Sequence, residues 1–395
     1  MCTTQHKRRS ALVRSLTCCF AATLTAQLSI AAPYAFKKIA DNTGPLQSFF
    51  IGRGPGTPTI NNSGQVAFFA TLDAGGQVIA TGNGGPITVA ADTAGPISSF
   101  AAAPEINDAG TLAISANLDD GERVIYRYEA GVLNPIVDST GPFLAFRNPS
   151  INNSGAIAFS AIADDGVNSI NVADSGSITP ITDSSGMFNT LGSPDINNSG
   201  TVAFFASFDA GGNGIFKSLS GGLQTVADTS GMFGAFSGLP QINDAEVAVF
   251  AAQLDSSSST TIYYTTAGAP NPIASTNGPY SFLNGTFGVN NSGGIAFSGG
   301  LDAGGSGIYT GGNPLTDTVI SVGSPLFGST ISTLGFGHGL NDLGDIAFYY
   351  TLANGQTGIA VAAPVPEPAI ASIFATIALA AAAFSRVLNH RRPCA

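Results

Sequence analysis

The sequence predicts an all-β fold: a seven-bladed β-propeller built from four-stranded repeats of about 46 residues. Three observations lead to this prediction. A short motif recurs seven times, each repeat contains four short apolar segments, and the two ends of the repeat region differ in phase. An N-terminal signal helix and a C-terminal transmembrane helix are expected outside the propeller.

The recurring motif has the form INNSGQVAF in its first copy, residues 60–68. Self-similarity at a fixed period is typical of repeat architectures. Asn tolerates left-handed dihedral angles and Gly supplies positive φ, so the motif predicts a tight turn before a strand. The copies start at Ile60, Ile106, Ile151, Ile196, Ile242, Val289 and Leu340. The predicted turn residues are Asn61, Gly64, Asn107, Gly110, Asn152, Gly155, Asn197, Gly200, Asn290, Gly293, Asn341 and Gly344. The copy at Ile242 is irregular, because Glu246 stands where the glycine is expected.

Each repeat contains four apolar segments bounded by Gly, Asn, Asp and Pro, which is the pattern of short strands joined by turns. The first segment is exemplified by residues 142–152 and the second, the strongest, by residues 66–70. The third is exemplified by residues 124–126 and the fourth by residues 87–90. Four short antiparallel strands in one repeat match one propeller blade.

The phase of the two ends predicts how the ring closes. Residues 36–41 (FKKIAD) have the pattern of a fourth strand, whereas residues 358–362 (GIAVA) have that of a third. Pairing these two segments would complete the seventh blade and remove a sheet edge that could template aggregation. An open solenoid is the alternative, but it has no need of this offset.

The N-terminal segment, residues 1–32, is predicted to be a secretory signal peptide. Lys7, Arg8 and Arg9 form a basic region, and an apolar run follows from Leu16 to about Ile30, before small residues suited to cleavage. A lipoprotein attachment at Cys18 or Cys19 is a weaker alternative. All four cysteines lie in the two terminal segments, so the processed body would carry no thiol.

The C-terminal segment, residues 364–395, is predicted to be a second targeting signal. Pro366, Glu367 and Pro368 precede an apolar run that can serve as a transmembrane helix over about residues 369–388. Arg391 and Arg392 close the segment, and basic residues there favour the cytoplasmic side. An ordinary C-terminal membrane anchor is the alternative. Residues 33–363 form the propeller domain between the two targeting signals. Whether the C-terminal segment is a sorting signal or an ordinary membrane anchor, the propeller domain is expected outside the cytoplasm.

This three-part tail resembles the PEP-CTERM sorting signal of Gram-negative bacteria, with Pro366, Glu367, Pro368, Arg391 and Arg392 as the matching residues. The resemblance implies an exosortase-type membrane protease as a processing partner, beside signal peptidase. It further implies an inner-membrane intermediate and then delivery to the cell surface or the exterior, often alongside exopolysaccharide. The body resembles secreted bacterial proteins with tandem NxxGxVAF repeats of the choice-of-anchor type, which implies a propeller-like body without a defined activity.

The charge of the body excludes one class of partner. Between the terminal segments lie seven basic and 24 acidic residues, a net charge of −17. Such a surface repels nucleic acid and anionic lipid. It can attract cations, although a solubilising role explains the same composition.

Aspartates recur in two sets of loops that a propeller would bring to one face. Hard oxygen ligands in flexible loops suit Ca²⁺, the one cofactor that the sequence suggests. The competing interpretation is that these aspartates cap turns through nearby backbone amides. The two sets are Asp41, Asp92, Asp138, Asp183 and Asp228, and Asp73, Asp119, Asp164, Asp209, Asp255 and Asp302.

The sequence contains no recognised catalytic motif. Paired carboxylates for glycoside hydrolysis stay open as an alternative, although most acids lie in the repeated turns, where a structural role explains them. His338 is the only histidine of the body, and its Gly-His-Gly setting favours an ordinary polar residue in a loop or strand end. No zinc, phosphate-loop or dinucleotide motif is present, and a chain without Trp cannot form the Asp-box of sialidases. Catalysis would need polar residues that break the repeat symmetry. The candidates are Glu122, Arg123, Arg127, Glu129 and Glu246, which exposed strand and turn positions also explain.

We therefore expect a non-catalytic exported protein, an interaction or structural propeller of the extracellular matrix. Seven similar repeats offer multivalent binding. The first alternative is a lectin-like module, which the lack of Trp disfavours. The second is a polysaccharide-active enzyme.

Overall fold

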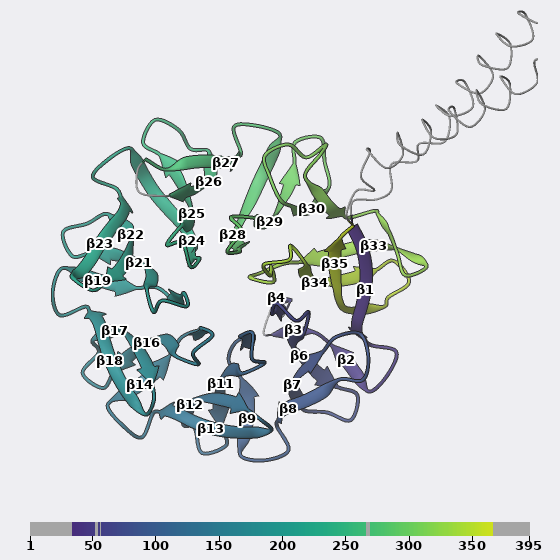
Figure 1. The fold of residues 1–395 in the computed structure, drawn as a ribbon, viewed down its shortest axis with the longest axis horizontal. Helices are drawn as coiled ribbons and strands as arrows, with labels where there is room; N and C mark the ends of the chain where they lie inside the picture. Colours follow the sequence, from purple (N-terminus) through teal and green to yellow (C-terminus); the bar gives the residue numbers. More distant parts are fainter. Residues whose placement is uncertain (1–33, 52–53, 56, 266–268, 366–395) are drawn as a thin grey trace, which may run out of the picture. The chain divides into compact units, whose positions relative to one another are not determined.

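The computed structural model describes residues 34–51, 54–55, 57–265 and 269–365, and these residues form a seven-bladed β-propeller (Figure 1). No helix occurs among them. The predicted signal peptide and the predicted tail helix lie outside the described residues. Within that described part of the chain, no helix has the length and apolar character needed to cross a membrane.

Each blade is an antiparallel sheet whose last strand lies at the outer rim (Figure 1). Blade one contains β2 (Leu46–Ser48), β5 (Thr59–Ile60), β6 (Val66–Leu72), β7 (Gln77–Gly82) and β8 (Thr88–Asp92). Blade two contains β9 (Ile97–Phe100), β10 (Glu105–Ile106), β11 (Leu112–Leu118), β12 (Arg123–Glu129) and β13 (Val132–Asp138). Blade three contains β14 (Phe143–Phe146), β15 (Ser150–Ile151), β16 (Ile157–Ala163), β17 (Asn168–Asp174) and β18 (Ser177–Asp183). Blade four contains β19 (Phe188–Leu191), β20 (Asp195–Ile196), β21 (Val202–Phe208), β22 (Asn213–Leu219) and β23 (Gly222–Asp228).

The remaining blades follow the same plan. Blade five contains β24 (Phe233–Ile242), β25 (Ala248–Leu254), β26 (Thr260–Thr265) and β27 (Asn271–Ser275). Blade six contains β28 (Tyr280–Val289), β29 (Ile295–Leu301), β30 (Ser306–Tyr309) and β31 (Thr318–Ser321). Blade seven contains β32 (Pro325–Leu326), β33 (Ser329–Gly335), β34 (Ile346–Leu352), β35 (Thr357–Pro364) and β1 (Tyr34–Asp41). A separate hairpin is formed by β3 (Phe50–Ile51) and β4 (Gly54–Pro55).

The first strand of a blade is less regular than the sequence predicts. In blade three it is split into β14 and β15, which both pair with β16. In blade five it is one strand, β24, whose register against β25 shifts twice. Register shifts bend a strand and increase its twist, so they carry the innermost strand around the narrow channel.

The ring closes as the sequence predicts, because the N-terminal strand β1 pairs with β35 as the outer strand of blade seven. The end of β1 is held by Asn42, whose amide donates to the carbonyl of Thr357 over 3.0 Å. Gln356 donates to the carboxylate of Asp41 over 2.7 Å. This pairing covers the edge of β35, which would otherwise be open to another chain.

The apolar core lies between neighbouring blades. Phe204 and Phe216 of blade four pack in one cluster with Ala158 and Ile170 of blade three. A corresponding cluster joins blade seven to blade one through Ile359. Each blade therefore buries one face against the blade before it and the other against the blade after it.

Candidate functional site

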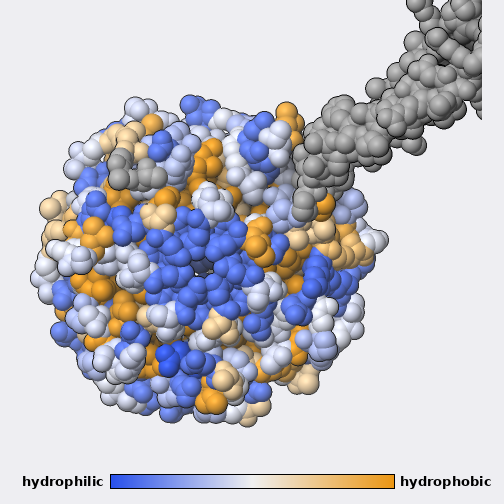
Figure 2. All heavy atoms as spheres, in the orientation of Figure 1, coloured by the Kyte–Doolittle hydropathy of each residue, from blue (hydrophilic) through white to orange (hydrophobic). Residues whose placement is uncertain are grey.

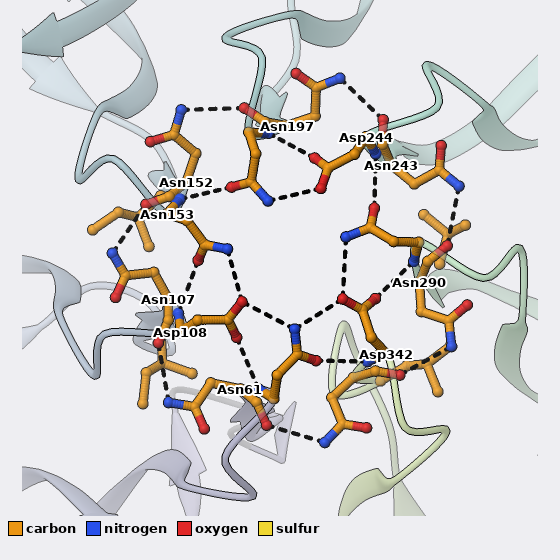
Figure 3. Close-up of a pocket in the computed structure, with 18 of the residues that line it drawn as sticks. Asn61, Asn107, Asp108, Asn152, Asn153, Asn197, Asn243, Asp244, Asn290 and Asp342 are labelled. Carbon is orange, nitrogen blue, oxygen red and sulfur yellow. Dashed lines mark hydrogen bonds between the residues drawn. The ribbon is translucent and has the colours of Figure 1, made fainter.

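The turns between the first two strands of the blades converge on the central channel, where the first motif asparagines form a closed ring, here called the asparagine ring (Figure 3). In each blade the side-chain Nδ2 donates to the backbone carbonyl of the equivalent asparagine in the next blade. The bond from Asn341 to the carbonyl of Asn61 spans 3.0 Å and completes the circle. The other six bonds, from 2.9 to 3.1 Å, start at Asn61, Asn107, Asn152, Asn197, Asn243 and Asn290.

The other end of each carboxamide shapes its own turn. Asn197 Oδ1 accepts hydrogen bonds from the amides of Ser199 and Thr201, at 3.1 and 2.9 Å. Gly200 completes the turn with a φ of 83°, the left-handed region in which a side chain is costly. The asparagine is buried, with only 4% exposed in Asn197. The predicted turn role of Asn and Gly is thus present, but the asparagine also links two blades.

The irregular fifth repeat keeps this geometry without glycine. Glu246 adopts a φ of 58°, and its carboxylate lies 2.9 Å from Lys217 Nζ of blade four. Asn243 still accepts the amides of its own turn, at 3.1 and 2.9 Å. Glu246 therefore serves a turn and an ion pair between blades.

The next residue of each motif forms a second ring, here called the Asn/Asp ring, around the channel opening (Figure 3). In every blade the backbone amide at this position donates to the side-chain Oδ1 of the equivalent residue in the next blade, over 2.7 to 2.9 Å. The seven residues are Asn62, Asp108, Asn153, Asn198, Asp244, Asn291 and Asp342. Hydrophilic residues accordingly surround the central opening (Figure 2).

The three aspartates of the Asn/Asp ring are never neighbours, which is also the largest number that a ring of seven permits without two adjacent acids. Asn62 donates its side-chain amide to Asp108 and Asp342, over 2.9 and 2.8 Å. Asn153 donates to Asp108 over 2.7 Å, and Asn198 to Asp244 over 2.8 Å. Each acid thus accepts from at least one neighbouring asparagine, and no acid faces a like charge directly.

The two rings surround a cavity of about 170 Å³ at the channel opening. Its polar groups are already paired around the circle. The geometry therefore suits the joining of seven blades better than the binding of a ligand. Polar groups that already hydrogen-bond to one another have few donors and acceptors left for a ligand.

A cluster of titratable side chains lies among the first strands, at positions that break the repeat symmetry. His338 Nδ1 of blade seven lies 3.2 Å from Glu105 Oε1 at the start of β10. Asp195 of blade four accepts the Ser150 hydroxyl over 2.8 Å and the Ile242 amide over 2.8 Å. His338 is placed by its flanking glycines, since a Cβ on Gly339 would lie 2.8 Å from the carbonyl oxygen of Pro58 in blade one.

Glu105, Asp195 and His338 are here called the channel cluster. Their environment shifts the pKa values of Asp195 and His338. Burial raises the pKa of Asp195 to about 6, although the Ile242 amide, His338 and Ser150 oppose that rise. Burial lowers the pKa of His338, but the hydrogen bond to Glu105 and the charges of Glu105 and Asp195 outweigh it, so the net pKa is raised. An acid and a base of this kind are the groups that acid–base chemistry requires.

The sequence patterns point to neither Glu105 nor Asp195, and they favour an ordinary polar role for His338. The available signal was the residue before the motif isoleucine, which is Thr59, Glu105, Ser150, Asp195 and Gln241 in the first five repeats. These residues differ within an otherwise regular repeat. The second motif residue, which forms the Asn/Asp ring, was likewise treated only as part of a turn.

The two sets of acidic loops meet on one face, as predicted. The amide of Asp119 donates to the Pro96 carbonyl, and that of Asp209 to the Met187 carbonyl, over 3.0 and 3.1 Å. Equivalent bonds start at Asp73, Asp164, Asp255 and Asp302. In this way each loop between the second and third strands contacts a loop between blades.

The aspartates of the loops between blades cap turns. Asp138 and Asp183 each accept a backbone amide and a hydroxyl from the residue two positions ahead. Asp92 and Asp228 accept the corresponding amides. For Asp41, burial raises the pKa, but hydrogen bonds from Lys38 and Thr43 lower it to about 2.

No group of three or more His, Cys, Asp or Glu side chains in the described part of the chain is arranged to hold a metal ion. Calcium binding by the loops stays a prediction. The sorting residues Pro366, Glu367, Pro368, Arg391 and Arg392 lie outside the described residues. Glu122, Arg123, Arg127 and Glu129 lie in or next to β12, where Arg127 Nε lies 3.6 Å from the Glu129 carboxylate.

Comparisons with solved structures find other propellers. An oligogalacturonate lyase from Vibrio parahaemolyticus aligns with a TM-score of 0.56 and 12% identity, covering 85% of this chain and 97% of the lyase. An oligogalacturonate lyase in complex with manganese aligns with a TM-score of 0.50 and 13% identity, over 85% and 99% of the two chains. A puromycin-hydrolyzing peptidase of Mycobacterium tuberculosis aligns at 0.51 and 14%, over 85% of this chain and 52% of the peptidase.

The likeness is one of fold. At these identities the alignments show a shared propeller architecture and no shared chemistry. No protein-family model matches the sequence, and a comparison with curated proteins finds no relative.

Proposed function

We propose that this chain is a non-catalytic, exported β-propeller that acts as an interaction or structural module of the cell envelope or extracellular matrix. The observation that carries the proposal is the pair of rings at the channel opening. There, seven carboxamides and seven backbone amides bind other residues of the same rings, from Asn61 around to Asn341. A centre of this kind serves rigidity, and the seven outward-facing sets of loops remain for multivalent contact.

The boundaries of the ring support processing at both ends. The last strand, β35, ends at Pro364, before the predicted sorting residues Pro366, Glu367 and Pro368. The first strand, β1, starts at Tyr34, after the predicted signal peptide. Signal peptidase and an exosortase-type membrane protease would therefore release a body whose blades are all complete. The product would pass through an inner-membrane intermediate to the surface or the exterior.

The sorting step is tested in a Gram-negative host that has an exosortase. Replacing Pro366, Glu367 and Pro368 together by alanine should leave full-length protein in the membrane fraction, because the protease would lose its recognition motif. Val365→Ala is the control and should be processed normally. Normal processing of the triple variant would contradict the sorting proposal.

The binding role is tested with the purified body, residues 33–364, whose described strands from β1 to β35 form one closed ring. The probes are the exopolysaccharide and the matrix proteins of the producing cells, together with a glycan array. Binding to matrix components without any change in them supports the proposal. Binding of defined glycans alone favours the lectin-like alternative. An absence of binding to all of these probes would contradict an interaction role.

A polysaccharide-active enzyme is the second candidate, because Glu105, Asp195 and His338 bring an acid and a base together within the ring. The lyases of similar fold are named for oligogalacturonate, which makes that polysaccharide fragment the first substrate to assay. Unsaturated product from the unmodified body, but not from Asp195→Asn or His338→Gln, would establish this candidate. Turnover that survives both substitutions would exclude the channel cluster as its source.

A further inference from the structure

A groove opens between the outer part of blade two and blade three, away from the central rings. Its volume is about 780 Å³, within the range of small-molecule sites. Ile136 and Val137 of β13 form one wall, and Phe143, Ile178 and Pro180 of blade three form the other. Ser169 and Asn171 of β17 also line it.

The groove coincides with one missing aromatic ring. In blades four, five and six, a second-strand phenylalanine faces an aromatic residue on the third strand, in the pairs Phe204–Phe216, Phe250–Tyr263 and Phe297–Tyr309. The ring centroids of these pairs lie 5.8 to 5.9 Å apart. In blade three, the third-strand partner of Phe159 is Asn171. A carboxamide fills much less space than a ring, so packing is lost on the side facing blade two.

Two other blades also lack this third-strand ring. In all three blades an aromatic residue from elsewhere in the chain packs on the second-strand phenylalanine, and in blade three Phe143 and Phe146 pack on Phe159 with centroid distances of 6.1 and 5.8 Å. In blade one the position is Ala80, and Phe49 packs on Phe68 with a centroid distance of 5.9 Å. In blade seven it is Ala360, and Phe36 of β1 packs on Phe348 at 6.2 Å. Blade three differs because the residue that replaces its third-strand ring is polar.

The polar substitute is itself buried. Asn171 and Ser169 are 3% and 8% exposed, and Asn171 Nδ2 donates to Ser169 Oγ over 2.8 Å. Although they bond to each other, this amide and hydroxyl stabilise the apolar contact between blades less than a buried aromatic ring would, which is a cost in stability. Such a cost is typical of a binding site, where a few polar groups orient a ligand among apolar walls.

The groove is acidic at one end. Asp138, Asp165 and Asp183 line it there. Hydrogen bonds from Ser185 lower the pKa of Asp183, so that its carboxylate is charged at neutral pH. A carboxylate-lined end favours a cation, and the apolar walls favour a hydrophobic body attached to it.

We propose that this groove binds a small apolar ligand that carries one positively charged amine. The hydrophobic part lies against Ile136, Phe143 and Ile178, in the space that an aromatic residue fills in blade four. The ammonium group faces Asp138 and Asp183. This site goes beyond the proposed function, and it does not depend on export or on the central rings.

The test uses 2-phenylethylammonium as probe and measures binding to the body, residues 33–364, by calorimetry and by ligand-observed NMR. The comparison probes are 2-phenylethanol, which is neutral, and phenylacetate, which is anionic. The ammonium should bind most tightly, the alcohol more weakly and the anion least. Added salt should weaken binding of the ammonium alone, because screening acts on the charge.

Two variants locate the site. Asn171→Phe should abolish binding of the ammonium and the alcohol and should raise Tm, since the ring would pack on Phe159 as Phe216 packs on Phe204. Asp183→Asn keeps the cap on Ser185 and should lower the affinity for the ammonium by about twofold to fivefold, as expected for one partly exposed ion pair. The affinity for the alcohol should stay the same.

The matched control is Asn134→Phe, which adds the same ring on the exposed side of β13, outside the groove. It should leave binding unchanged. Three results would overturn the proposal: no binding of the ammonium by the unmodified body, equal affinity for all three probes, or undiminished binding by a folded Asn171→Phe variant.

Discussion

Each asparagine of the asparagine ring uses both ends of its side chain. Asn197 Oδ1 accepts amides of its own turn, and its Nδ2 donates to the Asn243 carbonyl of the next blade over 3.0 Å. Aspartate lacks the donor and serine cannot reach both partners, so asparagine fits the position for a physical reason. The same residue therefore shapes a turn and joins two blades.

Asn197→Ala should lower the free energy of unfolding by about 2–3 kcal/mol, because it removes one of the two hydrogen bonds to the Asn243 carbonyl and leaves two turn amides without partners. The measurement is chemical denaturation of the body. Ser199→Ala is the control, because it removes a side-chain hydrogen bond within the same turn, at 2.8 Å from Asn197 Oδ1, and leaves the link between blades intact; it should cost less than about 1 kcal/mol. Equal effects of the two substitutions would show that the link between blades adds nothing beyond the turn.

At the scale of the element, the turns act as a set. The Asn/Asp ring places Asp108, Asp244 and Asp342 so that asparagines separate them. Asn153 and Asn198 are the only two adjacent positions of the ring that are both asparagine. One further acid at any position of the ring would have an aspartate beside it.

Asn198→Asp should therefore destabilise the body by about 1–2 kcal/mol near neutral pH, because it creates adjacent carboxylates at positions 198 and 244. The double variant Asn198→Asp/Asp244→Asn restores separation of the acids with the natural net charge, and it should recover most of the loss. A double-mutant cycle in unfolding free energy measures this coupling. If the two effects simply added, charge separation around the ring would be irrelevant.

At the scale of the whole molecule, stability depends on closure. β1 supplies the outer strand of blade seven from the opposite end of the chain, and the bond from Asn341 to Asn61 closes the asparagine ring in the same region. The first and last blades thus meet through a sheet, a core cluster and a pair of rings.

A body that begins at residue 42 lacks β1, so it should melt at a markedly lower temperature and aggregate, since the edge of β35 is then open. Ending the body at residue 364, after β35, should leave Tm unchanged compared with the chain that extends to residue 395. Thermal unfolding and light scattering measure both effects. An unchanged Tm without β1 would mean that the rings alone hold the propeller closed.

The channel cluster spans blades two, four and seven and should make stability depend on pH. The pKa of Asp195 rises from 3.8 to about 6 on folding, so the folded state loses stability as pH rises through that range. His338 has a raised pKa, so its contribution is present below its ordinary value of 6.5 and is lost at higher pH. Both groups act in the same direction.

Tm should therefore rise as pH falls from 8 to about 5. Below about pH 4 the trend should reverse, because folding lowers the pKa of Asp41 from 3.8 to about 2, and the stability that its ionised carboxylate contributes is lost as pH falls through that range. Asp195→Asn removes one titrating group and should flatten the profile between about pH 4 and 6, the range through which the pKa of Asp195 is raised. A Tm profile identical to that of the natural protein would show that Asp195 is not responsible.

Much of the fold of this protein can be predicted from local sequence features that recur in each repeat. The periodic motif, the turn residues and the phase of residues 36–41 against 358–362 predicted seven blades and their closure. These features are local, or they depend on pairing that the strand order requires. The meeting of the two sets of acidic loops followed from the same reasoning.

The sequence alone determined the blades and the ring that they form, because each repeat has to solve the same folding problem. Only the tertiary structure decided what meets between blades: the donor of Asn197 on its neighbour, the contact of His338 with Glu105, and the space beside Asn171. Those relations join residues that lie from tens to hundreds of positions apart. Their geometry depends on the curvature of the closed ring, which the pattern of a single repeat does not specify.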